Sequence, residues 1–106
     1  MVMVMSLFAA TTLRESKRMT ALLNIYEKQL EALPKGSLRE KERNGKTYYY
    51  LAYRNDGKVV SDYIGNDESI IDSLREQLKR RKGIETLIKN IKKELALMNK
   101  VLEVAK

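Results

Sequence analysis

Two glycine turns divide the middle of the 106-residue chain into three short segments, and they constrain its fold more than any other feature. The turns are Asn44-Gly45 and Asn55-Asp56-Gly57, and both residue types tolerate the positive φ that tight hairpins require. On either side of the turns, residues follow a period of two, as strands do. The sequence therefore predicts a three-stranded antiparallel meander with strands near residues 37–43, 46–54 and 58–64.

Helical spacing flanks the meander on both sides. Apolar residues recur at intervals of three and four over residues 12–33, and Pro34 then ends that pattern. After the meander, Asn66 or Asp67 can cap a second helix. We therefore predict an α+β fold with an N-terminal helix, the meander, and a long C-terminal helix that packs on the first.

The C-terminal apolar pattern changes phase at the basic run 79–82 and resumes from Ile84 about one residue out of step. Two interpretations fit this change. One is a single long helix that drifts or kinks at Gly83, and the other is two helices with Gly83 as the end cap of the first. Since no good capping residue follows Gly83, a single helix is favoured.

The N-terminal residues 1–18 are expected to be a disordered extension, ahead of a single domain at residues 19–106. Translation could instead start at Met19. The first ten residues are apolar, but no basic residue precedes them and they are shorter than the ~20 residues of a membrane span. We therefore expect a cytoplasmic protein with no membrane partner.

The chain carries 21 Lys and Arg against 14 Asp and Glu, which gives a formal net charge of +7. This balance favours an anionic partner. The chain has no Cys and no His, so disulfides, thiolate chemistry, the commonest zinc sites and the usual neutral-pH base are missing. We expect a protein that is not an enzyme, with no catalytic residues, metal site or cofactor.

The central tyrosines are divided between two sheet faces if Asn44-Gly45 forms a two-residue turn. That turn pairs Arg43 with Lys46, and every second residue of a strand then shares a face. One face, which carries Leu38, Tyr49, Leu51 and Tyr53, would pack against a helix. The other is predicted to carry cations and rings toward solvent, namely Arg39, Lys41, Arg43, Lys46, Tyr48, Tyr50 and Arg54.

The register of the third strand depends on the length of the second loop. A three-residue loop with a bulge at Gly57 would place Val59 and Tyr63 on the core face. A two-residue loop would place Val60 and Ile64 there instead. The sequence leaves both registers open.

Interleaved rings and cations on an exposed sheet are typical of nucleic-acid binding, because cations neutralise phosphates while rings stack on bases. The same pairs can also simply stabilise a sheet and keep its edge soluble. A second candidate for phosphate contacts is the helical run Lys79, Arg80, Arg81 and Lys82. Such runs are most often a solvated helix face.

The stretches LPKGSL (33–38), KTYYYLAYR (46–54) and GKVVSDYIG (57–65) resemble a pattern found in small uncharacterised bacterial and archaeal proteins. The resemblance covers roughly residues 19–95 and implies the fold, since that family has no established activity. The stretch GKTYYYLAYRNDGKVVSDYIG also resembles the N-terminal β-module of insertion-sequence transposases. That likeness implies a mobile-element setting and DNA association, although the transposase nuclease carboxylates have no counterpart here.

Three functions follow as hypotheses. The first is a nucleic-acid-binding accessory protein of a mobile genetic element, which contacts DNA or RNA through the cations and rings. The second is a phage- or plasmid-encoded inhibitor of an RNA-guided defence nuclease, of the anti-CRISPR class. Because the chain is basic, such an inhibitor would bind guide RNA, its groove in a nucleoprotein complex, or an acidic protein patch. The third is a helical homodimer or larger oligomer that buries the apolar stripe of the C-terminal helix.

Overall fold

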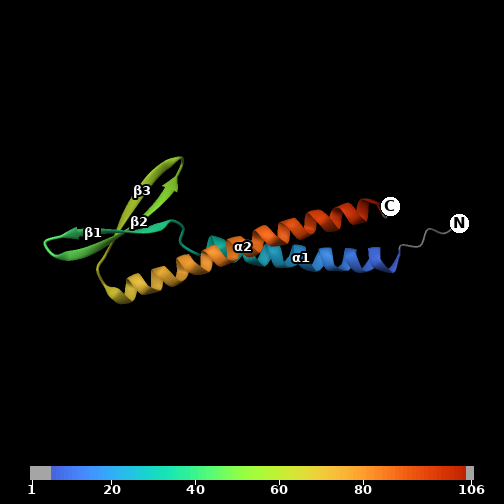
Figure 1. The fold of residues 1–106 in the computed structure, drawn as a ribbon, viewed down its shortest axis with the longest axis horizontal. Coiled ribbons are helices and arrows are strands. Elements are labelled where there is room, and N and C mark those ends of the chain that lie inside the picture. The colour runs from blue at the N-terminus through green and yellow to red at the C-terminus, as the bar shows by residue number, and fades with distance from the viewer. Residues whose placement is uncertain (1–5, 105–106) are drawn as a thin grey trace. The chain divides into compact units, whose positions relative to one another are not determined.

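The computed structural model describes residues 6–104, and it confirms the predicted fold class. A helix is followed by three strands and then by a much longer helix (Figure 1). The elements are α1 (Leu7–Glu31), β1 (Ser37–Arg43), β2 (Lys46–Asn55), β3 (Lys58–Gly65) and α2 (Glu68–Val104). Within the described residues, neither helix has an apolar stretch long enough to cross a bilayer.

Contacts within the chain gather in two compact units, and the single domain expected over residues 19–106 stays a prediction. The sheet unit is Ala32–Gly83. The helical unit consists of the described parts of Met1–Glu31 and Ile84–Lys106. Helix α2 contributes to both units, because the division falls between Gly83 and Ile84.

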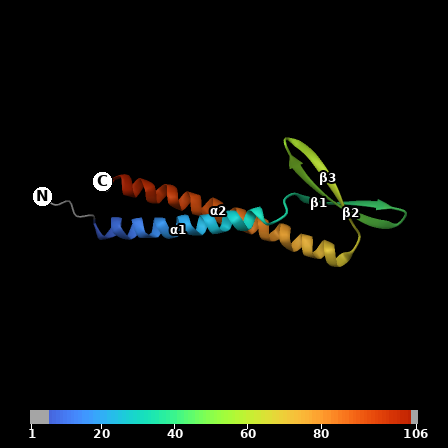
Figure 2. The same cartoon turned by 180° about the vertical axis from the view of Figure 1, so that it is seen from behind.

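The helical unit is an antiparallel pair of helices. A groove is lined by Phe8 and Ala9 at the start of α1 and by Val101 and Val104 at the end of α2, so the two ends are neighbours. Figure 2 shows the second half of α2 running beside α1 in the opposite direction. The buried residues recur at heptad-type spacing, as expected for two helices packed along a seam. They are Ala9 and Ser16 on α1 and Ile84, Ile88 and Ile91 on α2.

Helix α1 begins at Leu7, earlier than the sequence analysis predicted. The Ser6 hydroxyl accepts a hydrogen bond from the backbone N–H of Ala9 at 3.0 Å, which caps the first turn. Residues 7–18, which were expected to be a disordered extension, are therefore helical. Residues 1–5 of that extension lie outside the described residues.

The sheet has the order β1-β2-β3 and the predicted register between its first two strands. Arg43 pairs with Lys46, Lys41 with Tyr48 and Leu38 with Leu51. Asn44 and Gly45 have φ of 52° and 76°, and Asp56 and Gly57 have φ of 51° and 78°. Both loops are thus two-residue turns with positive φ at each position, as in a type I′ hairpin.

The third strand follows the two-residue alternative, because Asn55 pairs with Lys58. Val60 therefore pairs with Tyr53, and Tyr63 pairs with Tyr50. The register shifts between Tyr49 and Tyr50, so the pairing does not continue regularly to Ile64. Tyr63 consequently lies on the opposite face from the one that the three-residue loop would have given it.

One face of the sheet contacts the first half of α2, and we call it the inner face. The Arg75 guanidinium lies 5.4 Å from the centre of the Tyr49 ring and donates a 3.4 Å hydrogen bond to the Tyr49 hydroxyl. The buried apolar residues of the sheet unit are Leu51 on this face and Ile71 on α2, which are 9% and 2% exposed. The opposite face, which carries Tyr48 and Tyr50, is called the outer face.

Helix α2 begins at a capping aspartate and continues without a break. The Asp67 carboxylate accepts hydrogen bonds from the backbone N–H and the hydroxyl of Ser69, at 3.0 and 2.8 Å. The helix then runs through Gly83 to Val104. The favoured prediction of one long helix is confirmed, and Asp67 rather than Asn66 is the cap.

Candidate nucleic-acid interface

Five basic side chains share the outer face of the sheet. The β1–β2 register and the alternation of strand side chains place all of them on the side of Tyr48 and Tyr50. They are Arg39, Lys41 and Arg43 on β1 and Lys46 and Arg54 on β2. All five are exposed. The structure thus brings together every β-strand residue that the sequence predicted for this site.

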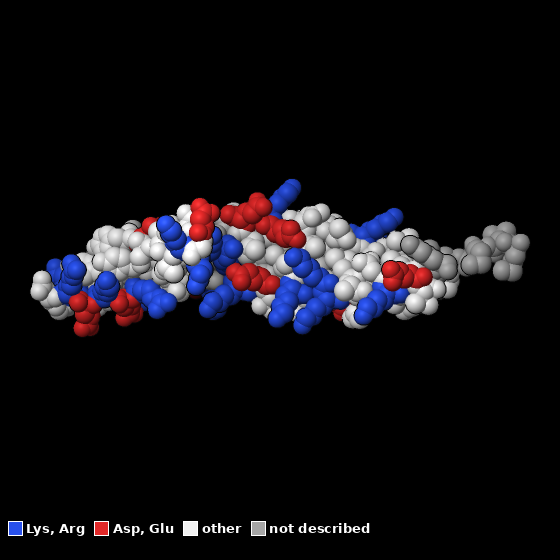
Figure 3. Space-filling model, turned by 90° about the horizontal axis from the view of Figure 1, so that it is seen from above, with Lys and Arg blue, Asp and Glu red and all other residues white. Residues whose placement is uncertain are grey.

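Strand β1 separates its charges by face. Its sequence alternates basic and acidic residues, so Arg39, Lys41 and Arg43 point outward while Glu40 and Glu42 belong to the inner face. Glu40 and Glu42 are both exposed. Where Figure 1 places the β1–β2 hairpin, Figure 3 shows Lys and Arg side chains beside acidic ones. The outer face is therefore cationic although the strand as a whole is nearly balanced.

Three tyrosine rings form a cluster among these cations. The Tyr63 ring centre lies 5.3 Å from that of Tyr50 and 6.2 Å from that of Tyr48. The Lys41 ammonium lies 5.4 Å from the centre of the Tyr50 ring, within range of a cation–π interaction. Tyr63 is 60% exposed. Tyr63 was not among the predicted site residues because the third-strand register was open, and the Asp56-Gly57 dipeptide was the signal that could have placed it.

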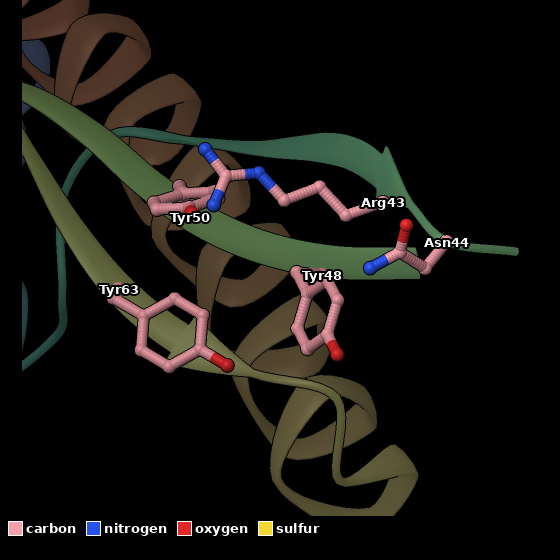
Figure 4. Close-up of a pocket in the computed structure, with 5 residues that line it drawn as sticks. All are labelled: Arg43, Asn44, Tyr48, Tyr50 and Tyr63. Carbon is pink, nitrogen blue, oxygen red and sulfur yellow. The ribbon is translucent and has the colours of Figure 1, made fainter. Parts of the chain in front are cut away.

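A hollow of about 390 Å³ opens between the ring cluster and the β1–β2 turn. Figure 4 shows the five residues that line it, with the Arg43 side chain extending back along the sheet toward the Tyr50 ring. In this view the α2 ribbon lies behind the sheet, and the Asn44 amide is directed toward Tyr48. The hollow combines three aromatic walls with one cation and one amide, namely Tyr48, Tyr50, Tyr63, Arg43 and Asn44.

The inner-face tyrosines, Tyr49 and Tyr53, contact charged side chains of the sheet unit and, within the described residues, no other rings. Tyr49 contacts Arg75, and the Tyr53 hydroxyl donates a 2.9 Å hydrogen bond to the Asp62 carboxylate. The Asp62 hydrogen bond raises the pKa of Tyr53, because the bond needs the phenol proton. Both side chains are partly buried.

The predicted basic run of Lys79 to Lys82 lies on α2 and not on the sheet. Arg81 is partly buried and donates a 3.0 Å hydrogen bond to the backbone carbonyl of Leu33, just before Pro34. That carbonyl lies just beyond the end of α1. Arg81 therefore ties the segment between α1 and β1 to α2, which is a structural role. The run and the outer face occupy different elements of the sheet unit.

Comparison with known proteins identifies a family but no activity. No curated protein and no solved structure matches the chain. One family model matches residues 14–77, which include most of α1, the whole sheet and the start of α2. The finer sequence pattern and the transposase-like resemblance stay predictions. Since the match covers more than half of the chain, the protein belongs to the family described as Domain of unknown function (DUF6788).

Proposed function

We propose that this protein binds nucleic acid through the outer face of its sheet and that it is not an enzyme. The observation that carries the proposal is the placement of the Lys41 ammonium over the Tyr50 ring, inside a cluster of tyrosines and cations. The side chains in this cluster offer positive charge, ring faces and hydrogen-bond donors. These are the groups that nucleic-acid-binding surfaces use.

The two sheet faces differ in what their tyrosines contact, and this difference supports the proposal. The inner face contacts α2 through Tyr49, whereas the Tyr63 ring on the outer face is largely open to solvent. Because most of the Tyr63 surface is exposed, its ring contributes little to a core. Rings held among cations can instead contact bases while the cations neutralise phosphates and release counterions.

A binding assay at two salt concentrations tests the proposal. The test variant changes Arg39, Lys41 and Arg43 together to Gln, and its affinity for labelled nucleic acid is measured by fluorescence anisotropy. At low salt we expect an affinity loss of about tenfold or more. The slope of log affinity against log salt should fall by about two to three, because each phosphate contact contributes roughly 0.7 to 0.9.

The matched control changes Lys89, Lys92 and Lys93 to Gln. These residues are exposed on α2 in the helical unit, and their replacement lowers the net charge by the same amount. We expect a much smaller loss from this variant. Equal losses from the two variants, or no binding by the wild type at low salt, would contradict the proposal.

We also propose self-association through the helical unit as a second candidate function. Leu97 and Val104 are exposed and lie one heptad apart on α2, and Leu7 and Phe8 are exposed at the start of α1. Burial of such residues against a second copy is hydrophobic, so it should hardly respond to salt. Light scattering should show a dimer that Leu97→Gln with Val104→Gln converts to a monomer. A wild-type monomer at high concentration would exclude it.

A further inference from the structure

We infer that the hollow on the outer face receives an unpaired base, so that the protein prefers single-stranded to duplex nucleic acid. This inference rests on the proposed function and deepens it. The hollow is the one lined by Arg43, Asn44, Tyr48, Tyr50 and Tyr63, and we call it the base pocket.

The ring geometry supplies surfaces for stacking. The Tyr63 plane is tilted by 39° from that of Tyr48 and by 58° from that of Tyr50. Rings tilted in this way do not cover one another's faces as a parallel stack would. Tyr63 also keeps 60% of its surface exposed. Each base has a flat π-face, so an open tyrosine face can stack on it with little dependence on sequence.

The polar groups of the base pocket come from the β1–β2 hairpin, with Asn44 in the turn and the Arg43 guanidinium reaching back toward the Tyr50 ring (Figure 4). Asn44 sits in the turn with φ of 52°, and its side chain is directed toward the pocket (Figure 4). An asparagine amide offers both a donor and an acceptor, which suits the edge of a base. The neighbouring Arg43 guanidinium can neutralise a phosphate or stack on a base. The pocket therefore has separate groups for the face of a base, for its edge and for its phosphate.

A nucleic-acid duplex cannot place a base face against the tyrosines of the base pocket. Its base faces are covered by the bases above and below, so tyrosines on a sheet would reach only grooves and backbone. The base pocket is also bounded by β2 and β3 as well as by the β1–β2 hairpin, which makes the face broader than a two-stranded ribbon. Sheet-borne aromatic residues that stack bases characteristically act on single strands whose bases are unstacked.

Anisotropy measurements with three probes test the inference. The probes are single-stranded DNA and single-stranded RNA of roughly 12 nucleotides, a length within the site sizes of sheet-based binders, and a DNA duplex of the same sequence. The wild type should bind at least one single strand about tenfold or more tightly than the duplex. The DNA and RNA arms identify which strand is preferred.

Substitutions at Tyr63 test whether its ring contributes to the affinity for single strands. Tyr63→Thr should weaken single-strand binding by about tenfold and leave duplex binding nearly unchanged, because threonine favours a strand but cannot stack. Tyr63→Phe should keep most of the affinity, since it retains the ring. Val59→Thr is the matched control, because Val59 is exposed on the same face of the same strand outside the pocket. Circular dichroism would verify that each variant is folded.

The outcomes separate this inference from the proposed function. Duplex binding as tight as single-strand binding would overturn the base pocket and leave the cationic face intact as a binding surface. Equal losses of single-strand affinity in Tyr63→Thr and Val59→Thr would also overturn the base pocket while leaving the cationic face as a binding surface. Absence of binding to all three probes at low salt would overturn both.

Discussion

Tyr48, Tyr49 and Tyr50 are consecutive, yet they belong to two sheet faces with different surroundings. The middle ring lies against Arg75 on the inner face, while its two neighbours join Tyr63 on the outer face. The residues are chemically identical, so the difference comes from strand alternation alone. The comparison shows that position in the pleat, and not residue type, decides whether a tyrosine contacts α2 or joins the ring cluster on the outer face.

The two faces should therefore respond oppositely to substitution. Changes on the inner face should lower the free energy of unfolding, because they remove buried contacts. Changes on the outer face should alter binding with little effect on stability.

Gly36→Ala should destabilise the sheet, and therefore both of its faces. Gly36 has φ of 121°, and a Cβ placed there would lie 2.4 Å from the carbonyl oxygen of Ala52. The positive φ is unfavourable for a residue with a side chain, and the Ala52 carbonyl leaves no room for a Cβ atom. We expect the free energy of unfolding to fall by about 3 kcal/mol, measured by chemical denaturation.

Gly57→Ala is the matched control for that variant. Gly57 also has positive φ, at 78°, but a Cβ there would meet no atom within 4 Å. Its cost should be limited to backbone strain, about 1 kcal/mol. A loss at Gly36 no larger than the loss at Gly57 would contradict the close approach to Ala52.

Leu51→Ala should destabilise the inner face without touching the outer one. Leu51 is 9% exposed, and its truncation leaves a cavity in a small core. We expect a loss of about 2 kcal/mol in denaturant unfolding. Val59→Ala on the outer face should cost about 0.5 kcal/mol or less, because Val59 is 69% exposed. Similar costs at the two positions would mean that the faces do not differ in burial.

Gly83→Ala should stabilise the protein. Gly83 lies within α2, is exposed, and has room for a Cβ with no atom within 4 Å. Alanine in a helix interior is more favourable than glycine by about 0.5–1 kcal/mol, so the melting temperature should rise. Binding through the outer face should not change. A lower melting temperature would show that α2 needs glycine at this position.

Acid should weaken the start of α2 through Asp67. The Ser69 hydroxyl, together with the backbone N–H groups of Ser69 and Ile70, holds the pKa of Asp67 below its usual value of 3.8. The stabilisation is therefore complete above that value and is lost as the pH falls through the lowered pKa.

The control for this effect is Asp67→Asn, which keeps a capping oxygen but does not titrate. Between pH 4 and pH 2, its melting temperature should fall slightly less than that of the wild type. Both proteins should melt at similar temperatures near pH 7. Identical pH profiles would argue against a contribution from the Asp67 carboxylate.

The sequence predicted the first hairpin and its two faces well, because local chemistry determines them. Asn44-Gly45 leaves only a two-residue turn, and the turn fixes the pairing of every residue on β1 with β2. The outer-face cations followed directly from that pairing. The capping of α2 by Asp67 was similarly local.

Features that depend on several elements were harder to predict. The register shift at Tyr49 and Tyr50 comes from how β3 pairs with β2, and Gly65, which has φ of 104° and pairs with Tyr49, is the residue that accompanies it. The Tyr63 contacts with Tyr48 and Tyr50 join two strands and were therefore missed. The bond from Arg81 to the Leu33 carbonyl joins residues 48 positions apart, so a charge run was interpreted as a surface feature.

The early start of α1 was missed for a different reason. The helical spacing was recognised only from residue 12, and Thr11 and Thr12 are poor helix formers that give little sign of a helix extending back to Leu7. In the structure their hydroxyls donate to the carbonyls of Leu7 and Phe8, one turn earlier. Ser6 was an available capping signal, but it stands alone before an apolar stretch.

The alternating charges of β1 have a consequence for how the strand finds its partner during folding. A slip of one residue against β2 would turn every side chain of β1 to the other side. Glu40 and Glu42 would then stand beside Tyr48 and Tyr50, and the three cations would point toward the helix-facing side. The outer face of the mispaired hairpin would keep Lys46 and Arg54, but it would lose three cations and gain two carboxylates beside the tyrosines.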